Sequence, residues 1–201
     1  MFSMLCGPME SGHTSLYGTK YFLIFIDNYT RITYISFLKN KCEVFMYFQK
    51  YKSEEANQLN KRIKILRSGN GKEFCNAAMD EFLLKHGIIH QKTNHYTPEE
   101  NGLLEWFNIT IVEKAKCLLF DAGLKQHFWA EAANTAVYLQ NRTVASSLNA
   151  KTAFELWTGV RPDISHLRLF GRTEMMHVPK EKRKKWNKKS EKCILVPTNV
   201  K

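Results

Sequence analysis

The pattern of apolar and polar positions predicts an α/β domain in the first part of the chain. Five apolar runs have the length and composition of strands, and turn residues separate them. In chain order, the runs are residues 2–7, 20–29, 31–40, 62–68 and 88–93. Because only a short turn at Asp27-Asn28 separates the second run from the third, we expect these two strands to pair as a hairpin.

Apolar residues recur at helical spacing in four further segments. These are residues 41–57, residues 77–87, a long stretch that begins at Pro98, and residues 126–143. Thr97 and Glu100 match a capping box around Pro98, and Gly87 is a C-cap candidate for the second segment. The long helix is expected to bury a stripe made of Leu104, Phe107, Ile111, Ala115 and Leu118.

The order of these segments predicts how the chain is organised. Three strands are followed by helices and strands in alternation, which favours a mixed sheet flanked by helices. We expect a core domain at residues 1–125, a helical extension of it at residues 126–170, and a basic C-terminal segment at residues 171–201.

Positive charge is concentrated near the C-terminal end. The chain has a net charge of +11 and a pI of about 9.4. Between Lys180 and Lys192, eight Lys or Arg residues against two Glu residues give a net charge of +6. Such a run is either a solvated face or a binding site for a polyanion. Trp186 lies within the run and can stack on a base or contact a cation.

The cysteines indicate a reducing environment. There are five of them, and no two have CxxC spacing, so neither a disulfide framework nor a zinc site is predicted. We expect reduced and mostly buried thiols in a nuclear or cytoplasmic protein that is not secreted. No apolar run is long enough to cross a membrane, so no membrane association is expected.

The segment "ILRSGNGKEF", residues 65–74, has the layout of a strand that presents a functional group at its tip. The apolar run ends at Arg67-Ser68, and a tight polar turn follows. An acid would be expected at the tip, but Gly69 stands there.

Three histidines bracket the strand predicted at residues 88–93, namely His86, His90 and His95. Two interpretations remain open. The three side chains form a metal cluster, or His86 simply caps the C-terminal end of the preceding helix. His90 can face either side of the sheet, because its neighbours do not fix its orientation.

Five motifs together carry a family resemblance. They occur in the order GTKYFLIFIDNYTR, LRSGNGKEF, HYTPEENGLLEWFN, HFWAEAANTAVYLQNR and SHLRLFG. From Leu5 to about Val196, the chain resembles the integrase core of copia-type LTR retrotransposon Pol polyproteins. The resemblance implies a ribonuclease-H-like fold with a mixed five-stranded sheet. It also implies DNA integration, in which three acids hold paired Mg²⁺ or Mn²⁺ ions for strand transfer.

The family pattern assigns the three acids to particular positions. The first acid precedes a Leu-Cys-Gly-Pro-like stretch, and Met4 stands there. The second corresponds to Gly69, and the third corresponds to Glu105, which is present. Glu105 alone would bind a metal weakly at best, so the resemblance implies a degenerate active site without catalysis. Asp27 could replace one of the missing metal-binding acids, but we expect it to be a turn residue.

The resemblance implies DNA as a partner, and RNA as a further one. Candidate nucleic-acid-binding residues are Lys72, Asn101, Asn108, Lys182, Arg183, Lys184, Lys185, Trp186, Lys188 and Lys189. Trp106 and Ile109 stand where the family usually has Arg. Core positions that still fit their elements are Phe22, Ile24, Ile26, Phe82, Ile88, Leu104, Phe128, Trp129 and Leu169.

Four functional hypotheses remain open from the sequence. The chain is an inactive integrase core that binds nucleic acid, an active DNA-processing enzyme, a non-enzymatic protein-interaction scaffold, or a fragment without function. The first agrees best with the missing acids and the positive charge. A homo-oligomer is expected from the family, and no small-molecule substrate is expected.

Overall fold

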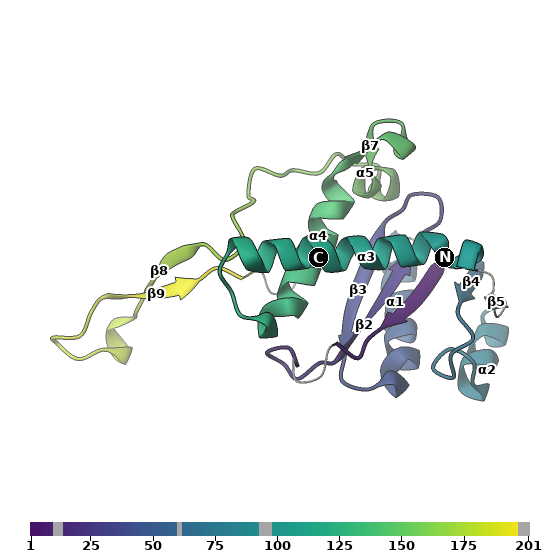
Figure 1. The fold of residues 1–201 in the computed structure, drawn as a ribbon, viewed down its shortest axis with the longest axis horizontal. Coiled ribbons are helices and arrows are strands. Elements are labelled where there is room, and N and C mark those ends of the chain that lie inside the picture. Colours follow the sequence, from purple (N-terminus) through teal and green to yellow (C-terminus); the bar gives the residue numbers. More distant parts are fainter. Residues whose placement is uncertain (10–13, 60–61, 93–97, 197–201) are drawn as a thin grey trace.

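A five-stranded mixed sheet forms the centre of the molecule (Figure 1). The computed structural model describes residues 1–9, 14–59, 62–92 and 98–196. The strands are β1 (Phe2–Cys6), β2 (Tyr21–Ile26), β3 (Thr33–Leu38), β4 (Ile65–Ser68) and β5 (Ile89–Lys92), in the spatial order β3-β2-β1-β4-β5. β2 pairs antiparallel with β1 and β3, whereas β4 pairs parallel with β1 and β5. The predicted mixed sheet and the β2–β3 hairpin are therefore confirmed.

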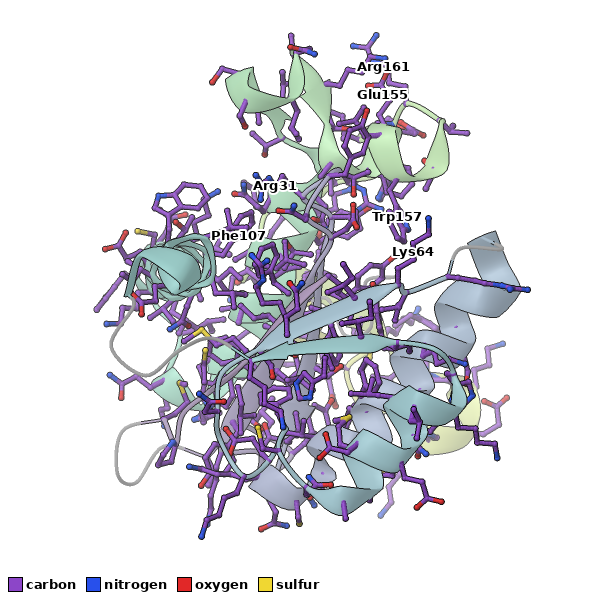
Figure 2. All side chains as sticks on the ribbon, turned by 90° about the vertical axis from the view of Figure 1, so that its right-hand side faces the viewer. Arg31, Lys64, Phe107, Glu155, Trp157 and Arg161 are labelled. Carbon is purple, nitrogen blue, oxygen red and sulfur yellow. The ribbon has the colours of Figure 1, made fainter. Side chains whose placement is uncertain are left out.

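Helices cover both faces of this sheet. They are α1 (Val44–Leu59, after the 3-10 turn η1 at Lys41–Glu43), α2 (Ala77–Lys85), α3 (Pro98–Asp121) and α4 (Trp129–Arg142, after the 3-10 turn η2 at Gln126–Phe128). Figure 2, in which α3 is seen along its axis, shows α3 on one side of the sheet and α1 and α2 on the other. The order of elements agrees with the prediction, and α3 begins at Pro98 as expected. Thr97 lies outside the described residues.

Two apolar cores follow from the alternation of side chains along the central strands. Phe22, Ile24 and Ile26 point to the α3 and α4 face, where they pack with the apolar stripe of α3. Leu23 and Phe25 point the other way and pack with α1 and α2. Phe107 lies on the side of α3 that faces the sheet (Figure 2), and it is buried there. The predicted stripe of α3 is confirmed, since Leu104, Phe107, Ile111 and Ala115 are buried and Leu118 packs against the same core.

Side chains fix the two ends of α2. The Asn76 Oδ1 atom accepts a hydrogen bond of 3.0 Å from the Met79 N–H, an N-cap that the sequence analysis missed. The helix ends before Gly87, whose φ of +64° lies in the left-handed region that glycine adopts readily. The Gly87 prediction is confirmed.

The extension after α3 is joined to the edge strand β3. Asn141 of α4 accepts a hydrogen bond of 2.9 Å from the Thr33 N–H and donates one of 2.8 Å to the Thr33 carbonyl. The chain then forms β6 (Val144–Ala145), the 3-10 turn η3 (Ser146–Leu148), β7 (Lys151–Thr152) and α5 (Ala153–Thr158). Trp157 points from α5 toward the sheet (Figure 2), and its ring lies edge-on to Tyr34 at 6.5 Å.

The C-terminal segment is a β-hairpin that extends away from the sheet (Figure 1). It consists of β8 (Thr173–His177) and β9 (Ser190–Ile194), which pair antiparallel, and the sequence analysis did not predict these strands. We call residues 178–189 the β8–β9 loop, and this loop includes the 3-10 turn η4 (Lys180–Lys182).

The base of this hairpin packs against the end of α3. Phe170 is buried in the α3 and α4 core. The prediction that Leu169 is a core residue is wrong, because Leu169 is 75% exposed and its neighbour Phe170 takes the buried position. Gly171 has a φ of +73°, and a Cβ atom there would collide with Ala122. A glycine is therefore required where the chain passes α3.

The described cysteines are all free thiols, but most of them are not buried. Only Cys6 is buried, whereas Cys42 and Cys117 are exposed. The expectation of mostly buried thiols is therefore wrong. Burial raises the pKa of the Cys6 thiol to about 12. No helix in the described part of the chain combines the length and the apolar character that a membrane span requires.

Candidate functional site between β1 and the tip of β4

The strand register brings two of the three family acid positions side by side. Phe2 pairs with Arg67 and Ser3 with Ser68, so Met4 is the next residue of β1 and Gly69 directly follows β4. Because side chains alternate along a strand, Met4 points to the same face as Phe2. Met4 is half-buried and packs against the core beneath α3.

The space beside Met4 is open at Gly69. Arg67 lies two residues earlier, and its guanidinium carbon sits 5.1 Å from the centre of the Phe2 ring. By the same alternation, a side chain at position 69 would leave the backbone on this face. A Cβ atom at Gly69 would meet no heavy atom within 4 Å. The strand tip therefore has room for an acid and presents none.

The third position, Glu105, lies on α3, which packs across β1. It is exposed and sits between the buried residues Leu104 and Phe107. The exposed Trp106 ring contacts the Phe107 ring edge-on, with centroids 5.0 Å apart. Glu105 is thus the one carboxylate among the three family positions.

These residues do not fit a pair of divalent metal ions. Mg²⁺ requires hard oxygen ligands in near-octahedral geometry, whereas Met4 offers a soft thioether and Gly69 offers no side chain. Across the described residues, no group of three His, Cys, Asp or Glu side chains is arranged to hold a metal. A single exposed carboxylate at position 105 cannot replace the set of three.

Asp27 does not substitute for a missing acid. Its Oδ2 atom accepts hydrogen bonds from the Tyr29 N–H at 3.2 Å, the Thr30 N–H at 2.8 Å and the Thr30 hydroxyl at 2.8 Å. These bonds close the turn between β2 and β3. The expectation that Asp27 is a turn residue is confirmed.

A series of interacting polar side chains, which the sequence analysis missed, lies on the opposite face of β4. The Ser68 Oγ and His90 Nε2 atoms are 2.9 Å apart, and His90 Nδ1 lies 3.6 Å from the Asp80 carboxylate. Lys92 reaches the same carboxylate at 3.8 Å. The strand pairing of β4 with β5 would have revealed these contacts, because it places Ser68 and His90 on the face that α2 covers.

These side chains follow the order Ser, His, Asp that is found in hydrolase active sites. Their surroundings indicate a structural role instead. Ser68 is fully buried, and its hydroxyl donates to the Gly69 carbonyl at 3.1 Å. A substrate could not reach that hydroxyl. The interactions among Ser68, His90 and Asp80 therefore hold the tip of β4 in place. Burial is the main cause that lowers the pKa of His90; Lys92 adds to this effect and Asp80 opposes it.

Within the part of the chain that the structure describes, His86 and His90 belong to no group of three side chains that could hold a metal. The His86 Nδ1 atom lies 2.9 Å from the Phe82 carbonyl, so the interpretation of His86 as a helix cap is confirmed. His95 lies outside the described residues.

The candidate nucleic-acid residues fall into two separate groups. Lys72 is exposed in the turn after β4, and Asn108 is half-buried on α3 with an Oδ1 atom that has no partner among the described atoms. Nothing is described of the Asn101 side chain. The remaining residues, from Lys182 to Lys189, lie in the β8–β9 loop, where all are exposed except the half-buried Arg183. This loop lies at the other end of α3 from the tip of β4 (Figure 1).

Comparison with known proteins gives relatives over almost the whole chain. No family model matches. The chain is 41% identical over 196 residues to the retrovirus-related Pol polyprotein from transposon TNT 1-94 of Nicotiana tabacum, a match that covers 98% of this chain. It is 34% identical over 177 residues to the corresponding polyprotein from transposon RE1 of Arabidopsis thaliana, over 88% of this chain. The chain spans only 15% and 12% of these two polyproteins.

Solved structures share the fold at low sequence identity. The HTLV-2 integrase catalytic core domain in complex with magnesium, in its trimeric form, gives a TM-score of 0.57 at 18% identity, covering 78% of this chain and 93% of that one. A chain of the simian T-cell lymphotropic virus intasome, in complex with PP2A regulatory subunit B56 gamma, gives a TM-score of 0.63 at 14% identity. That match covers 96% of this chain and 66% of the other. The chain is therefore similar over almost its whole length to one segment of the retrovirus-related Pol polyproteins of transposons, and it has the ribonuclease-H-like fold of an integrase catalytic core.

Proposed function

We propose that this chain is an integrase-core domain that binds nucleic acid through the β8–β9 loop and does not catalyse metal-dependent strand transfer. The observation that carries the proposal is the pair of neighbouring positions Met4, in the middle of β1, and Gly69, directly after β4, which stand in place of acids while the surrounding fold is intact. Loss of even one metal-binding carboxylate is expected to cost several kcal/mol of transition-state stabilisation, of order the metal's own contribution. Two losses would abolish turnover.

The structural neighbours support DNA as the class of partner but do not identify the binding surface. One structural neighbour is part of an intasome, and another is an integrase core in complex with magnesium. In this chain, the net charge of +11 and the exposed lysines of the loop favour binding to a polyanion such as DNA or RNA. The proposal includes a nuclear or cytoplasmic location, where such a partner is present.

Restoring the two acids tests the catalytic half of the proposal. The wild-type chain and the double variant Met4→Asp, Gly69→Asp would be compared in strand-transfer and nicking assays with Mg²⁺ or Mn²⁺. Gly69 has open space for the new side chain, whereas Met4→Asp places a carboxylate against an apolar core. A thermal melt of both proteins therefore accompanies the assay. Calorimetric titration with Mn²⁺ alone reports metal binding independently of activity.

We expect no cleavage and at most weak Mn²⁺ binding by the wild-type chain, and clearly tighter Mn²⁺ binding by the double variant. A triple variant that adds Glu105→Gln is the matched control, and it should lose the restored binding. Cleavage by the wild-type chain that grows with Mn²⁺ concentration would contradict the proposal, because another acid would then have to serve as ligand. Asp27→Asn would be the first variant to test in that case.

A protein-interaction scaffold is the second candidate, and one surface of α3 favours it. Trp106, Ile109 and Phe120 are exposed on this helix, although large apolar side chains are usually buried. A second copy of the chain or another protein would cover them. Light scattering over a salt series separates the two candidates, because apolar association persists at high salt while phosphate binding does not.

A further inference from the structure

We propose that the β8–β9 loop is a site for single-stranded nucleic acid, in which Trp186 stacks on an unpaired base and the neighbouring lysines contact phosphates. This inference rests on the proposed function and specifies its ligand. It follows from the backbone of the loop, the exposure of the tryptophan and the charges beside it.

The loop has a defined backbone. The Val178 N–H donates to the Lys189 carbonyl at 3.0 Å, which extends the β8–β9 ladder by one rung. Farther out, the Asn187 N–H donates to the Lys184 carbonyl at 3.0 Å. This bond closes a four-residue turn in which Lys185 and Trp186 are the central residues. Trp186 therefore stands at the apex of a hydrogen-bonded turn.

Packing within the chain does not explain the position of Trp186. Its side chain is 92% exposed, more than any other large apolar side chain in the described part of the molecule. Its ring contacts no other aromatic ring and no cation among the described residues. An indole offers a large flat apolar surface, which is normally buried or used at an interface. The apex presents this surface to an external partner.

The charges around Trp186 identify the kind of partner. Lys184 and Lys185 precede it, Lys188 and Lys189 follow it, and all four are exposed. The loop as a whole carries seven basic residues and the single acid Glu181. No ion pair formed within the described residues involves the loop. Phosphates are the polyanion groups that such free ammonium groups bind, with release of counterions.

The indole and the lysines together distinguish single strands from duplexes. Lysines contact the phosphates of either form. A base in the middle of a duplex has both faces covered by its neighbours, so a single indole reaches only an unpaired or terminal base. Base–aromatic stacking stabilises single-strand binding without sequence preference. The indole therefore adds affinity for a single strand and adds almost none for a duplex.

The test compares an oligothymidylate with a blunt duplex of equal length, by fluorescence anisotropy at low salt. We expect the wild-type chain to bind the single strand more tightly. Trp186→Ala should weaken that binding by about fivefold or more, because stacking contributes at least this factor per base. Duplex affinity should change by less than about twofold, since the lysines remain. Trp186→Phe should retain most of the single-strand affinity.

Met176→Ala, an exposed change on β8 outside the loop, is the matched control and should leave both affinities unchanged. Circular dichroism checks that each variant is folded. The inference is overturned if Trp186→Ala leaves single-strand binding unchanged, or if it weakens both ligands equally. Absence of binding to either ligand by the wild-type chain would instead overturn the proposed function, and this inference with it.

Discussion

Buried polar side chains determine the shape of the β4 tip at the scale of single residues. Ser68 and His90 share a hydrogen bond beneath the strand, and Asp80 and Lys92 lie on the far side of the imidazole. The turn that begins at Gly69 is held from below by the Ser68 hydroxyl. Side chains of the protein itself therefore hold the tip of β4 in place.

Protonation of His90 should weaken the fold. Its pKa is lowered in the folded chain, so the unfolded chain binds the proton more readily, with the usual pKa of 6.5. The free energy of unfolding should then fall as the pH drops below about 6.5, by about 1.4 kcal/mol for each unit of pKa lowering. Urea denaturation from pH 7.5 to pH 5 measures this slope.

Variants isolate the His90 contribution to that slope. His90→Gln should show a flatter pH dependence, and His177→Gln, a change at an exposed histidine of β8, should match the wild type. If His90→Gln and wild type lose stability in parallel, His90 is not the group that titrates. Glu131 acts in the opposite direction, because burial raises its pKa and the folded chain is favoured as that carboxyl becomes protonated.

At the scale of elements, α4 holds the edge of the sheet. Asn141 satisfies both the N–H and the carbonyl of Thr33, and both residues are buried. Water cannot replace these bonds without opening the contact between α4 and β3. The extension after α3 is thus part of the support for the central sheet.

Asn141→Ala should destabilise the chain by about 2–4 kcal/mol, because it leaves two buried backbone groups without partners. Urea denaturation measures the loss, and amide hydrogen exchange at Thr33 should quicken. Asn134→Ala on the same helix is the control and should change the free energy of unfolding by less than about 0.5 kcal/mol. Equal stability of the two variants would show that water satisfies Thr33 and that α4 does not hold β3.

Local patterns predicted the central elements well and the C-terminal ones poorly. The strands and helices from Phe2 to Arg142 follow clear apolar periods, so their order was predictable. β8 was not, because Thr173–His177 are mostly exposed and the adjacent basic run hides the hairpin signal. The burial of Phe170 rather than Leu169 depends on the left-handed turn at Gly171, which a linear pattern does not reveal.

The candidate site shows a similar division. The positions of Met4, Gly69 and Glu105 came from a resemblance, and the strand register then placed the first two side by side. The partner of His90 could not be predicted, because the side of the sheet that a strand residue faces depends on its neighbours in space. Asn101 and His95 remain predictions, since nothing is described of their side chains.

At the scale of the whole molecule, the β8–β9 loop, our proposed nucleic-acid surface, and the family acid positions lie toward opposite ends of α3 (Figure 1). Binding at the β8–β9 loop should therefore be independent of the residues at positions 4 and 69. The double variant Met4→Asp, Gly69→Asp should bind an oligothymidylate as the wild type does. A marked change in its affinity would indicate that positions 4 and 69 contribute to binding.

Charge reversal in the loop should instead reduce the salt dependence of binding. A quadruple variant changes Lys182, Arg183, Lys184 and Lys185 to Glu. If all four residues contact phosphates, the slope of log affinity against log salt should become shallower by about 3, since each contact on a single strand contributes about 0.7. The matched control changes Lys20, Lys39, Lys50 and Lys151 to Glu, four exposed lysines outside the loop. Both variants lower the net charge from +11 to +3, so any difference between them reports position rather than total charge. If the two slopes change equally, the protein attracts nucleic acid through its overall charge, and the loop is only a solvated run of lysines.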